Sequence, residues 1–470
     1  RLSHAILRRE LRPARERAPE EGRPAKEKRD WRIILDMLKE TNPGLFELIS
    51  RKMLNYLSYA GIADAKHLLR RLSASRGPGQ EDYDDNRPQH LTAAVDPAAV
   101  TEETFHIAAT HLGEEEILSQ IQVWMKEDRA SFLAEALESR ETSLSDIAAA
   151  MERYRLMGVD TRELTMATQV GMKTSLVRRV LTDHMDFVET SRKYLEVEDF
   201  FDLLNHTVLV PKSYGKLGGK SSGLFLASNI IRRSKEHADV LGRIRIPKSW
   251  YLPSDVLLQF LVINHLDDVY NWKYREIDQI RQEYPHIQHV FKSSRFPPEA
   301  VRGLSEVLDF FKDRPLIVRS SSLLEDQMGA AFSGKYKSLF LANQGDKSER
   351  MASLLDALAE VYASVFSPDP IQYRAERGLL DQHEEMGIMI QEVVGTQVGR
   401  YFLPAFSGVG FSNNEFRWSP RIRREDGLLR LVPGLGTRAV DRFTDDYPVL
   451  VAPGQPNLRV NVTPEETVRY

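Results

Sequence analysis

The chain has 470 residues, of which 42% are hydrophobic and 28% are charged, with a formal net charge of -4 at pH 7 and no cysteine. This length is enough for two or three domains with separate cores, and the composition is that of an ordinary soluble protein. The small negative charge argues against a nucleic-acid or anionic-membrane partner, and the absence of cysteine excludes disulfides, thiolate catalysis and cysteine metal sites.

No stretch of the sequence has the apolar length of a membrane span, and no signal peptide is visible, so the expected location is the cytoplasm. Residues 1–30 are dense in Arg, Lys, Glu and Pro. Such a composition cannot bury enough surface to offset the entropy of ordering, so we expect a mobile charged arm. A polybasic binding element is the less favoured alternative, because acidic residues are interspersed among the basic ones.

Apolar residues recur at helical spacing from Trp31 onward, and they predict a small helical module over residues 31–73. Within it, Asn42 followed by Pro43 is typical of a helix start. Residues 74–97 are rich in Gly, Pro and charge, which predicts a linker or an exposed loop.

A second helical region is expected over residues 98–205. Three consecutive acids beginning at Glu114 favour a helix start there, and Ser143 with Asp146 matches a capping box. These helices carry no cluster of histidines and carboxylates at metal-ligand spacing, which favours a regulatory or assembly role over a chemical one.

Beyond residue 205, short apolar runs alternate with helical segments, so residues 206–470 are expected to form a domain that mixes helices and strands. The strand candidates are residues 206–210, 316–318, 387–391 and 401–411. The helix candidates are residues 223–234, 254–265, 298–311 and 350–366.

The most informative motif is Arg319, which directly follows an apolar run and is itself followed by three serines. A guanidinium fork and hydroxyl groups at the end of a buried strand suit the oxygens of a polyphosphate, and glycines such as Gly334 let a later loop approach the ligand. The alternative is a strand end at which Arg319 pairs with Glu325 or Asp326 and the serines cap a turn. Residue chemistry alone leaves both interpretations open.

A second glycine-rich segment, G-K-L-G-G-K-S-S-G, covers residues 215–223. It is one residue short of the P-loop pattern, because Tyr214 stands where the first glycine would be, so a true P-loop is rejected. Lys220, which follows the glycine pair, is either a phosphate ligand or a solvated side chain at a helix start.

These motifs resemble the amino-terminal nucleotide-binding domain of the phosphoenolpyruvate synthase and pyruvate phosphate dikinase family, which rifampin phosphotransferases share. The quoted patterns are V-R-S-S-S-x-x-E-D-x-x-x-A-x-F-S-G and L-G-G-K-x-x-x-L, and the resemblance covers roughly residues 210–470. It implies an α+β fold, in which an ATP-grasp-type, two-lobed nucleotide-binding domain follows an all-α amino-terminal region. ATP and Mg²⁺ are the implied ligands.

The resemblance implies a role for individual residues. Lys220 and Arg319 would contact the phosphates of ATP as the catalytic pair. The residues expected around the same phosphates are Gly218, Gly219, Ser320 and Gly334. The segment I-Q-E-V-V resembles the family's hinge strand V-Q-x-M-V, with a plain core strand as the alternative. The residues expected at the adenine are Gln391, Glu392, Val393 and Val394.

The metal site departs from the family pattern. Thr437 stands where the family has a glutamate that helps to hold magnesium, and Val449 stands where it has a glutamine. A hydroxyl group is a weaker ligand for Mg²⁺ than a carboxylate. Asp441 is the substitute metal ligand that we predict.

The leading functional hypothesis is a phosphotransferase module that passes a phosphoryl group from Mg·ATP to a histidine outside this segment. No T-S-H-type segment of the family's swivelling histidine domain is found, so we expect that histidine beyond Tyr470 or on a partner. The alternative is a non-catalytic ATP or ADP sensor with the same fold, which Thr437 motivates. The final phosphoryl acceptor is not indicated by the sequence.

Overall fold

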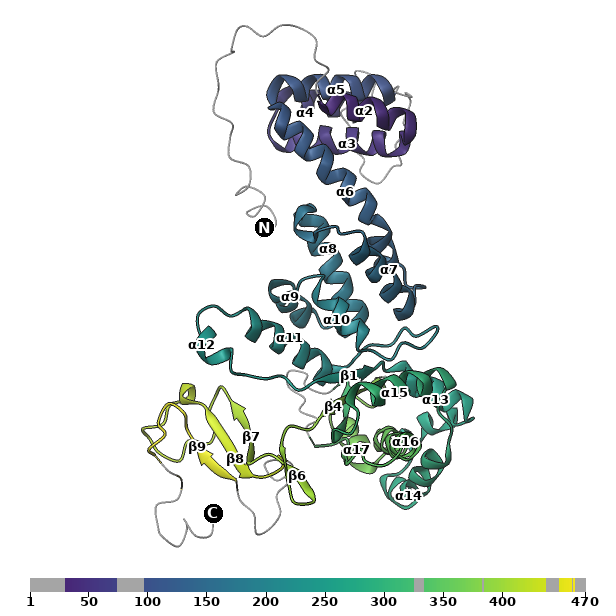
Figure 1. Ribbon diagram of the computed structural model, residues 1–470, viewed down its shortest axis with the longest axis vertical. Coiled ribbons are helices and arrows are strands. Elements are labelled where there is room, and N and C mark those ends of the chain that lie inside the picture. The colour runs from purple at the N-terminus through teal and green to yellow at the C-terminus, as the bar shows by residue number, and fades with distance from the viewer. Residues whose placement is uncertain are drawn as a thin grey trace. The chain divides into compact units, whose positions relative to one another are not determined.

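The computed structural model describes residues 30–73, 97–324, 334–382, 384–436, 448–458 and 460 (Figure 1). The chain divides into two compact units, one of Arg1–Glu135 with Tyr154–Val170 and one of Ala136–Arg153 with Gly171–Tyr470. Helices precede a part that mixes helices with strands, which confirms the α+β prediction. Within the described residues, no helix combines the length and apolarity that a membrane span needs.

The part of the chain before residue 177 is helical, and the predicted helix starts at Pro43, Glu114 and Leu144 are confirmed. Asn42 caps α3, because its Oδ1 accepts a hydrogen bond from the Leu45 N–H at 3.2 Å and Pro43 follows as the first helical residue. Trp31 and Phe105 stack in the core with ring centroids 5.6 Å apart. The helices that begin in this part of the chain are α2 (Asp30–Thr41), α3 (Pro43–Tyr59), α4 (Ala63–Ser73), α5 (Pro97–His111), α6 (Glu114–Glu138), α7 (Leu144–Leu156) and α8 (Met166–Leu176).

The second unit adds a π-helical turn at Val177–Leu181 and further helices. These helices are α9 (Met185–Tyr194), α10 (Asp199–Asn205), α11 (Gly219–Arg233), α12 (Ala238–Leu241), α13 (Asp255–Ile263), α14 (Ile277–Ser293), α15 (Pro298–Phe311), α16 (Lys347–Ser364) and α17 (Pro368–Glu376). The predicted helix over residues 298–311 is confirmed at both ends. A capping box starts α16: Asp346 Oδ1 accepts from the Glu349 N–H at 2.9 Å, and Glu349 Oε2 accepts from the Asp346 N–H at 3.0 Å.

The main sheet has four antiparallel strands in the order β1 (Ser249–Leu252), β4 (Met386–Glu392), β2 (Leu316–Ser322) and β3 (Ser338–Leu341). One smaller sheet pairs β5 (Thr396–Val398) with β6 (Tyr401–Leu403). Another contains β7 (Phe406–Phe411), β8 (Leu428–Pro433) and β9 (Val449–Val451).

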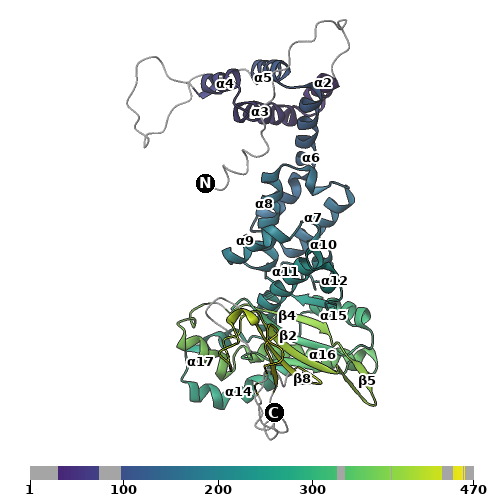
Figure 2. The ribbon, with the colours of Figure 1, turned by 90° about the vertical axis from the view of Figure 1, so that its left-hand side faces the viewer.

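The main sheet presents two different faces because side chains alternate along a strand. Val318 and Ile390 pair in register, are fully buried, and belong to one large core with side chains of α13, α15 and α16. Figure 2 shows α15 and α16 beside β2 and β4. The opposite face carries alternate residues, among them Arg319 of β2 and Gln391 of β4. Arg319 and Gln391 therefore lie on the face opposite this core, next to Met389 and Ile317, with which they pair in register.

Two strand predictions need correction. In residues 206–210 only Thr207 forms an isolated bridge, which is parallel and joins it to Tyr251. The next hydrogen bond of a parallel ladder would use the N–H of residue 253, but Pro253 has none, so the pairing cannot continue. The predicted strand over residues 401–411 is divided into β6 and β7 around Pro404, for the same reason.

Gly303 in α15 provides a test of the packing between this helix and the chain before the sheet. A Cβ atom at Gly303 would lie 2.5 Å from Cγ1 of Val208, which is 1% exposed. Alanine would gain up to about 1 kcal/mol in helix propensity. Overpacking costs roughly 1–3 kcal/mol, so we expect Gly303→Ala to lower the melting temperature.

The matched control is Gly171→Ala, at a glycine in the middle of α8 with no atom within 4 Å of the added Cβ. Here propensity acts alone, and the melting temperature should rise. Thermal unfolding followed by circular dichroism distinguishes the two. A rise for both variants would show that α15 does not pack against Val208 as described.

Candidate functional site

Lys220 of α11 contacts Ser320 of β2, which is 100 positions away in the sequence and directly follows Arg319. Lys220 is in the first turn of α11, and its Nζ donates a hydrogen bond to Ser320 Oγ at 3.1 Å. Ser320 directly follows Arg319 on β2. Both basic side chains are half-buried. The lysine of one motif therefore contacts the serine run of the other.

The start of α11 is attached to the end of β2 by paired serines. The Ser221 N–H donates to Ser321 Oγ at 3.0 Å, and the two hydroxyl oxygens are 2.9 Å apart. Gly218, just before the helix, has a φ of +83°, and a Cβ atom there would lie 1.6 Å from the carbonyl oxygen of Ser321. Only glycine tolerates both the backbone conformation and the close approach.

The loop before α11 also covers β4. Gly387 pairs in register with Ser321, and a Cβ atom on Gly387 would lie 2.7 Å from the carbonyl oxygen of Leu217. Arg319 is two residues from Ser321 and therefore leaves the sheet on the face that this loop covers. Gln391 pairs with Ile317 on the same face, farther along the strands. Arg319 and the predicted hinge residue Gln391 thus share one face of the sheet, whereas Ser320 alternates onto the other.

The hinge residues make structural hydrogen bonds. Gln391 Nε2 donates to Ser249 Oγ at 2.8 Å, and Glu392 accepts from the Lys248 N–H at 3.0 Å and pairs with Arg314 at 3.0 Å. The N–H groups of Glu392 and Val393 donate to the carbonyls of Lys248 and Pro315, at 3.0 and 2.9 Å. These two N–H groups are therefore already satisfied within the protein. Val394 is 60% exposed and offers an apolar surface next to them.

For the other predicted site residues, the structure gives a position in the chain, or it does not describe them. Gly219 is the first residue of α11, and Gly334 is exposed, with a φ of +76°. Thr437 and Asp441 lie outside the described residues. Among the residues that the structure describes, no three His, Asp or Glu side chains gather as they would around a metal ion. The binding roles assigned to all these residues stay predictions.

Sequence reasoning missed the residues that hold the glycine-rich loop from one side. Asp255 accepts from Ser213 Oγ at 2.8 Å and from the Tyr214 N–H at 2.7 Å, and Ser254 Oγ accepts from the Lys216 N–H at 3.1 Å. Ser254 precedes α13, but its side chain makes no capping hydrogen bond there and instead donates to Glu385 at 3.0 Å. A serine–aspartate pair at a helix start has the same sequence pattern in either role.

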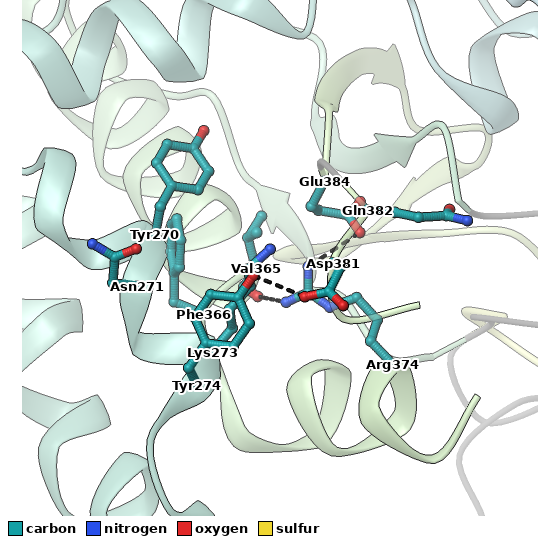
Figure 3. Close-up of a pocket in the computed structure, with 10 residues that line it drawn as sticks. All are labelled: Tyr270, Asn271, Lys273, Tyr274, Val365, Phe366, Arg374, Asp381, Gln382 and Glu384. Carbon is teal, nitrogen blue, oxygen red and sulfur yellow. Dashed lines mark hydrogen bonds and ion pairs between the residues drawn. The ribbon is translucent and has the colours of Figure 1, made fainter. Parts of the chain in front are cut away.

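A pocket of about 200 Å³ lies near the last residue of β2 and contains none of the predicted site residues (Figure 3). Burial and the nearby Arg374 charge lower the pKa of Lys273 in this pocket, while Asp381 acts in the opposite direction. The pocket is lined by Tyr270, Asn271, Lys273, Tyr274, Val365, Phe366, Arg374, Asp381, Gln382 and Glu384.

A buried ion pair joins this pocket to the sheet. Arg374 and Glu384 have side chains that are 3% and 2% exposed, with Nη1 and Oε2 3.4 Å apart. Arg374 also donates to the Val365 carbonyl at 3.0 Å, and Glu384 accepts a hydrogen bond from Ser322 at the end of β2. The serine run that begins beside Arg319 is therefore connected through Glu384 to the interior of the pocket.

The sequence was compared with models of known protein families. Residues 214–470 match the model described as pyruvate phosphate dikinase, AMP/ATP-binding domain. The match begins at the glycine-rich loop, includes both β2 and β4, and covers more than half of the 470 residues. It agrees with the family that the sequence motifs resemble. This chain belongs to the pyruvate phosphate dikinase family of AMP/ATP-binding domains.

Proposed function

We propose that this chain is the ATP-binding module of a phosphotransferase, which passes a phosphoryl group from Mg·ATP to a histidine outside the segment. The observation that supports this proposal best is the contact between Lys220 and Ser320, next to Arg319. Three features that each suit phosphate meet there: a lysine, an arginine and the start of the 15-residue helix α11. Helix starts carry partial positive charge and unpaired N–H groups, so they favour anions.

The proposed orientation of ATP follows the two strands. The phosphates would lie at the α11 end, against Lys220 and Arg319. The adenine would lie at the other end, near Gln391 and the exposed Val394. Since the Glu392 and Val393 N–H groups already have partners, recognition of the purine would use other groups of this segment, such as carbonyl oxygens.

Catalysis by such a module depends on position and charge. Lys220 and Arg319 would neutralise the phosphates and orient the transferring group toward the incoming imidazole. Arg319 keeps its charge at all physiological pH values, which suits charge that develops during transfer. Magnesium, when bound, would supply further charge neutralisation. Magnesium at a nucleotide is commonly held by one or two carboxylates together with the phosphates, and Asp441 is the protein ligand proposed here.

The alternative is a sensor that binds ATP or ADP without transferring phosphate. Thr437 in place of the family's glutamate is the observation that favours it. A sensor needs the phosphate contacts of Lys220 and Arg319 but not a complete metal site. Both functions therefore predict that substitution of Lys220 or Arg319 weakens nucleotide binding. Only the phosphotransferase predicts transfer of a phosphoryl group.

Removing either basic side chain should weaken nucleotide binding. We expect Lys220→Ala and Arg319→Ala each to reduce ATP affinity by about tenfold or more, because a charge-assisted phosphate contact contributes roughly 1.5–3 kcal/mol. Isothermal titration calorimetry measures the affinity, and circular dichroism checks that the variants fold. The matched controls are Lys347→Ala and Arg302→Ala, two surface residues in exposed ion pairs. Equal affinity in site and control variants would remove the proposed site.

Phosphoryl transfer separates the enzyme from the sensor. With the histidine domain present, in the same chain or added separately, ATP labelled on its phosphates should label a histidine. Arg319→Ala should abolish that label, and isotope exchange between ATP and ADP should be detectable only in the unsubstituted protein. Exchange would reject the sensor hypothesis. Nucleotide binding without label or exchange would reject the phosphotransferase.

The metal site gives a separate prediction. If Thr437 has replaced the family carboxylate without compensation, Thr437→Glu should strengthen Mg·ATP binding, because a carboxylate is a better ligand for a hard cation than a hydroxyl. If Asp441 supplies the ligand, Thr437→Glu should have little effect and Asp441→Asn should abolish the effect of Mg²⁺. Nucleotide titrations with and without Mg²⁺ measure both. No response in either variant would mean that the metal binds elsewhere.

A further inference from the structure

The glycine-rich loop is held on a second side by residues that precede the family match. The Leu217 N–H donates to the Val180 carbonyl at 3.0 Å, and Lys216 forms an ion pair with Asp183. Asp183 also pairs with Arg178, whose Nε is 3.3 Å from Oδ1. Leu217 and Val180 are fully buried, so the backbone contact is protected from water. The family match begins only at residue 214.

The segment that makes this contact has an unusual backbone. Val177–Leu181 forms a π-helical turn, and the Thr182 N–H closes it by donating to the Val177 carbonyl at 3.0 Å. Such turns are rare and cluster at functional sites, since an extra residue in a turn redirects the groups that follow. Here the turn ends at Leu181, two residues before Asp183. The irregular backbone and the ion-pair partner of Lys216 therefore belong to one local feature.

Burial of Asp183 acts to raise the pKa of its carboxyl group, but the hydrogen bonds and charges of Lys216 and Arg178 outweigh it and lower the pKa. The carboxylate is therefore charged at neutral pH, when it faces Lys216. The Lys216 side chain is only 18% exposed and lies four residues before Lys220. If Asp183 were neutral, the positive charge of the Lys216 amine would lose its ion-pair partner at a position that is largely shielded from water.

Two further contacts involve the helical segments around this turn. The Leu144 N–H donates to the Ser213 carbonyl at 2.7 Å, and the Tyr214 hydroxyl donates to the Glu141 carbonyl at 3.3 Å. At the other end of α11, Arg232 and Arg233 pair with Asp199, whose side chain is 6% exposed. The loop before α11 is thus attached to Glu141 and Leu144, and the last turn of α11 is attached to Asp199.

We propose that Asp183 and the π-helical turn Val177–Leu181 position the glycine-rich loop, so that the segment that contains them regulates how well Lys220 binds nucleotide phosphates. This inference rests on the proposed function, because it takes Lys220 as a phosphate ligand. It assigns Asp183 as a positioning residue that acts through Lys216. By thermodynamic linkage, nucleotide binding must in turn stabilise the 177–183 segment.

The first test is a double-mutant cycle between Asp183 and Lys216, with ATP affinity as the readout. Asp183→Asn keeps the shape of the side chain and removes its charge, and Lys216→Met keeps most of the length and removes the amine. We expect each to weaken ATP binding by roughly three- to tenfold and the double variant to be no worse than either single variant. Asp183→Glu, which restores the charge, should recover most of the affinity. The control is Glu189→Gln on α9, an exposed carboxylate 3.9 Å from Lys193.

The second test is amide hydrogen exchange with and without ATP. Residues 177–183 should gain protection on ATP binding in the unsubstituted protein and lose that gain in Asp183→Asn. Unchanged ATP affinity in both single variants, while Lys220→Ala abolishes binding, would overturn this inference and leave the proposed function intact. Additive losses in the double variant would also overturn it. If Lys220→Ala itself has no effect on ATP binding, the proposed function fails instead.

Discussion

The close backbone contact between Gly218 and Ser321 is the constraint on which the site depends. A Cβ atom at position 218 would lie 1.6 Å from the Ser321 carbonyl oxygen, a distance that no side chain tolerates. Because glycine permits the contact, the first turn of α11 can settle against the serines of β2, and Lys220 reaches Ser320. The contact of Lys220 with the residue after Arg319 therefore follows from this approach of two backbones.

The loop that makes this approach is held by three separate parts of the chain. Asp255 binds Ser213 and the Tyr214 N–H, Val180 binds the Leu217 N–H, and the end of β2 receives α11. Most of these contacts satisfy backbone polar groups that would be costly to leave unpaired in a buried loop. A flexible loop would lose conformational entropy when it closed on a phosphate, and a loop already held in this way loses less.

The polar end of β2 extends beyond the predicted phosphate site. Ser322 is bonded to Glu384, which pairs with Arg374 in an almost fully buried position. A buried pair of this kind stabilises little in net terms, but loss of one partner leaves an uncompensated charge and costs about 3–5 kcal/mol. Ser322 at the end of β2 is therefore bonded to an ion pair in which the loss of either partner would be costly. This contact helps to hold the serine run in place.

The sequence alone determined the family, the α+β class and the two motifs with phosphate chemistry, because these depend on local patterns of residue type: an arginine after an apolar strand, and a glycine pair before a lysine. It also located Asn42 as a helix cap and α15 from end to end. Only the tertiary structure decided that Lys220 contacts Ser320, that Ser254 binds Lys216 instead of capping α13, and that Val180 and Asp183 hold the loop. These contacts join residues 33 to 100 positions apart, and no local pattern encodes which distant groups will satisfy a given polar atom.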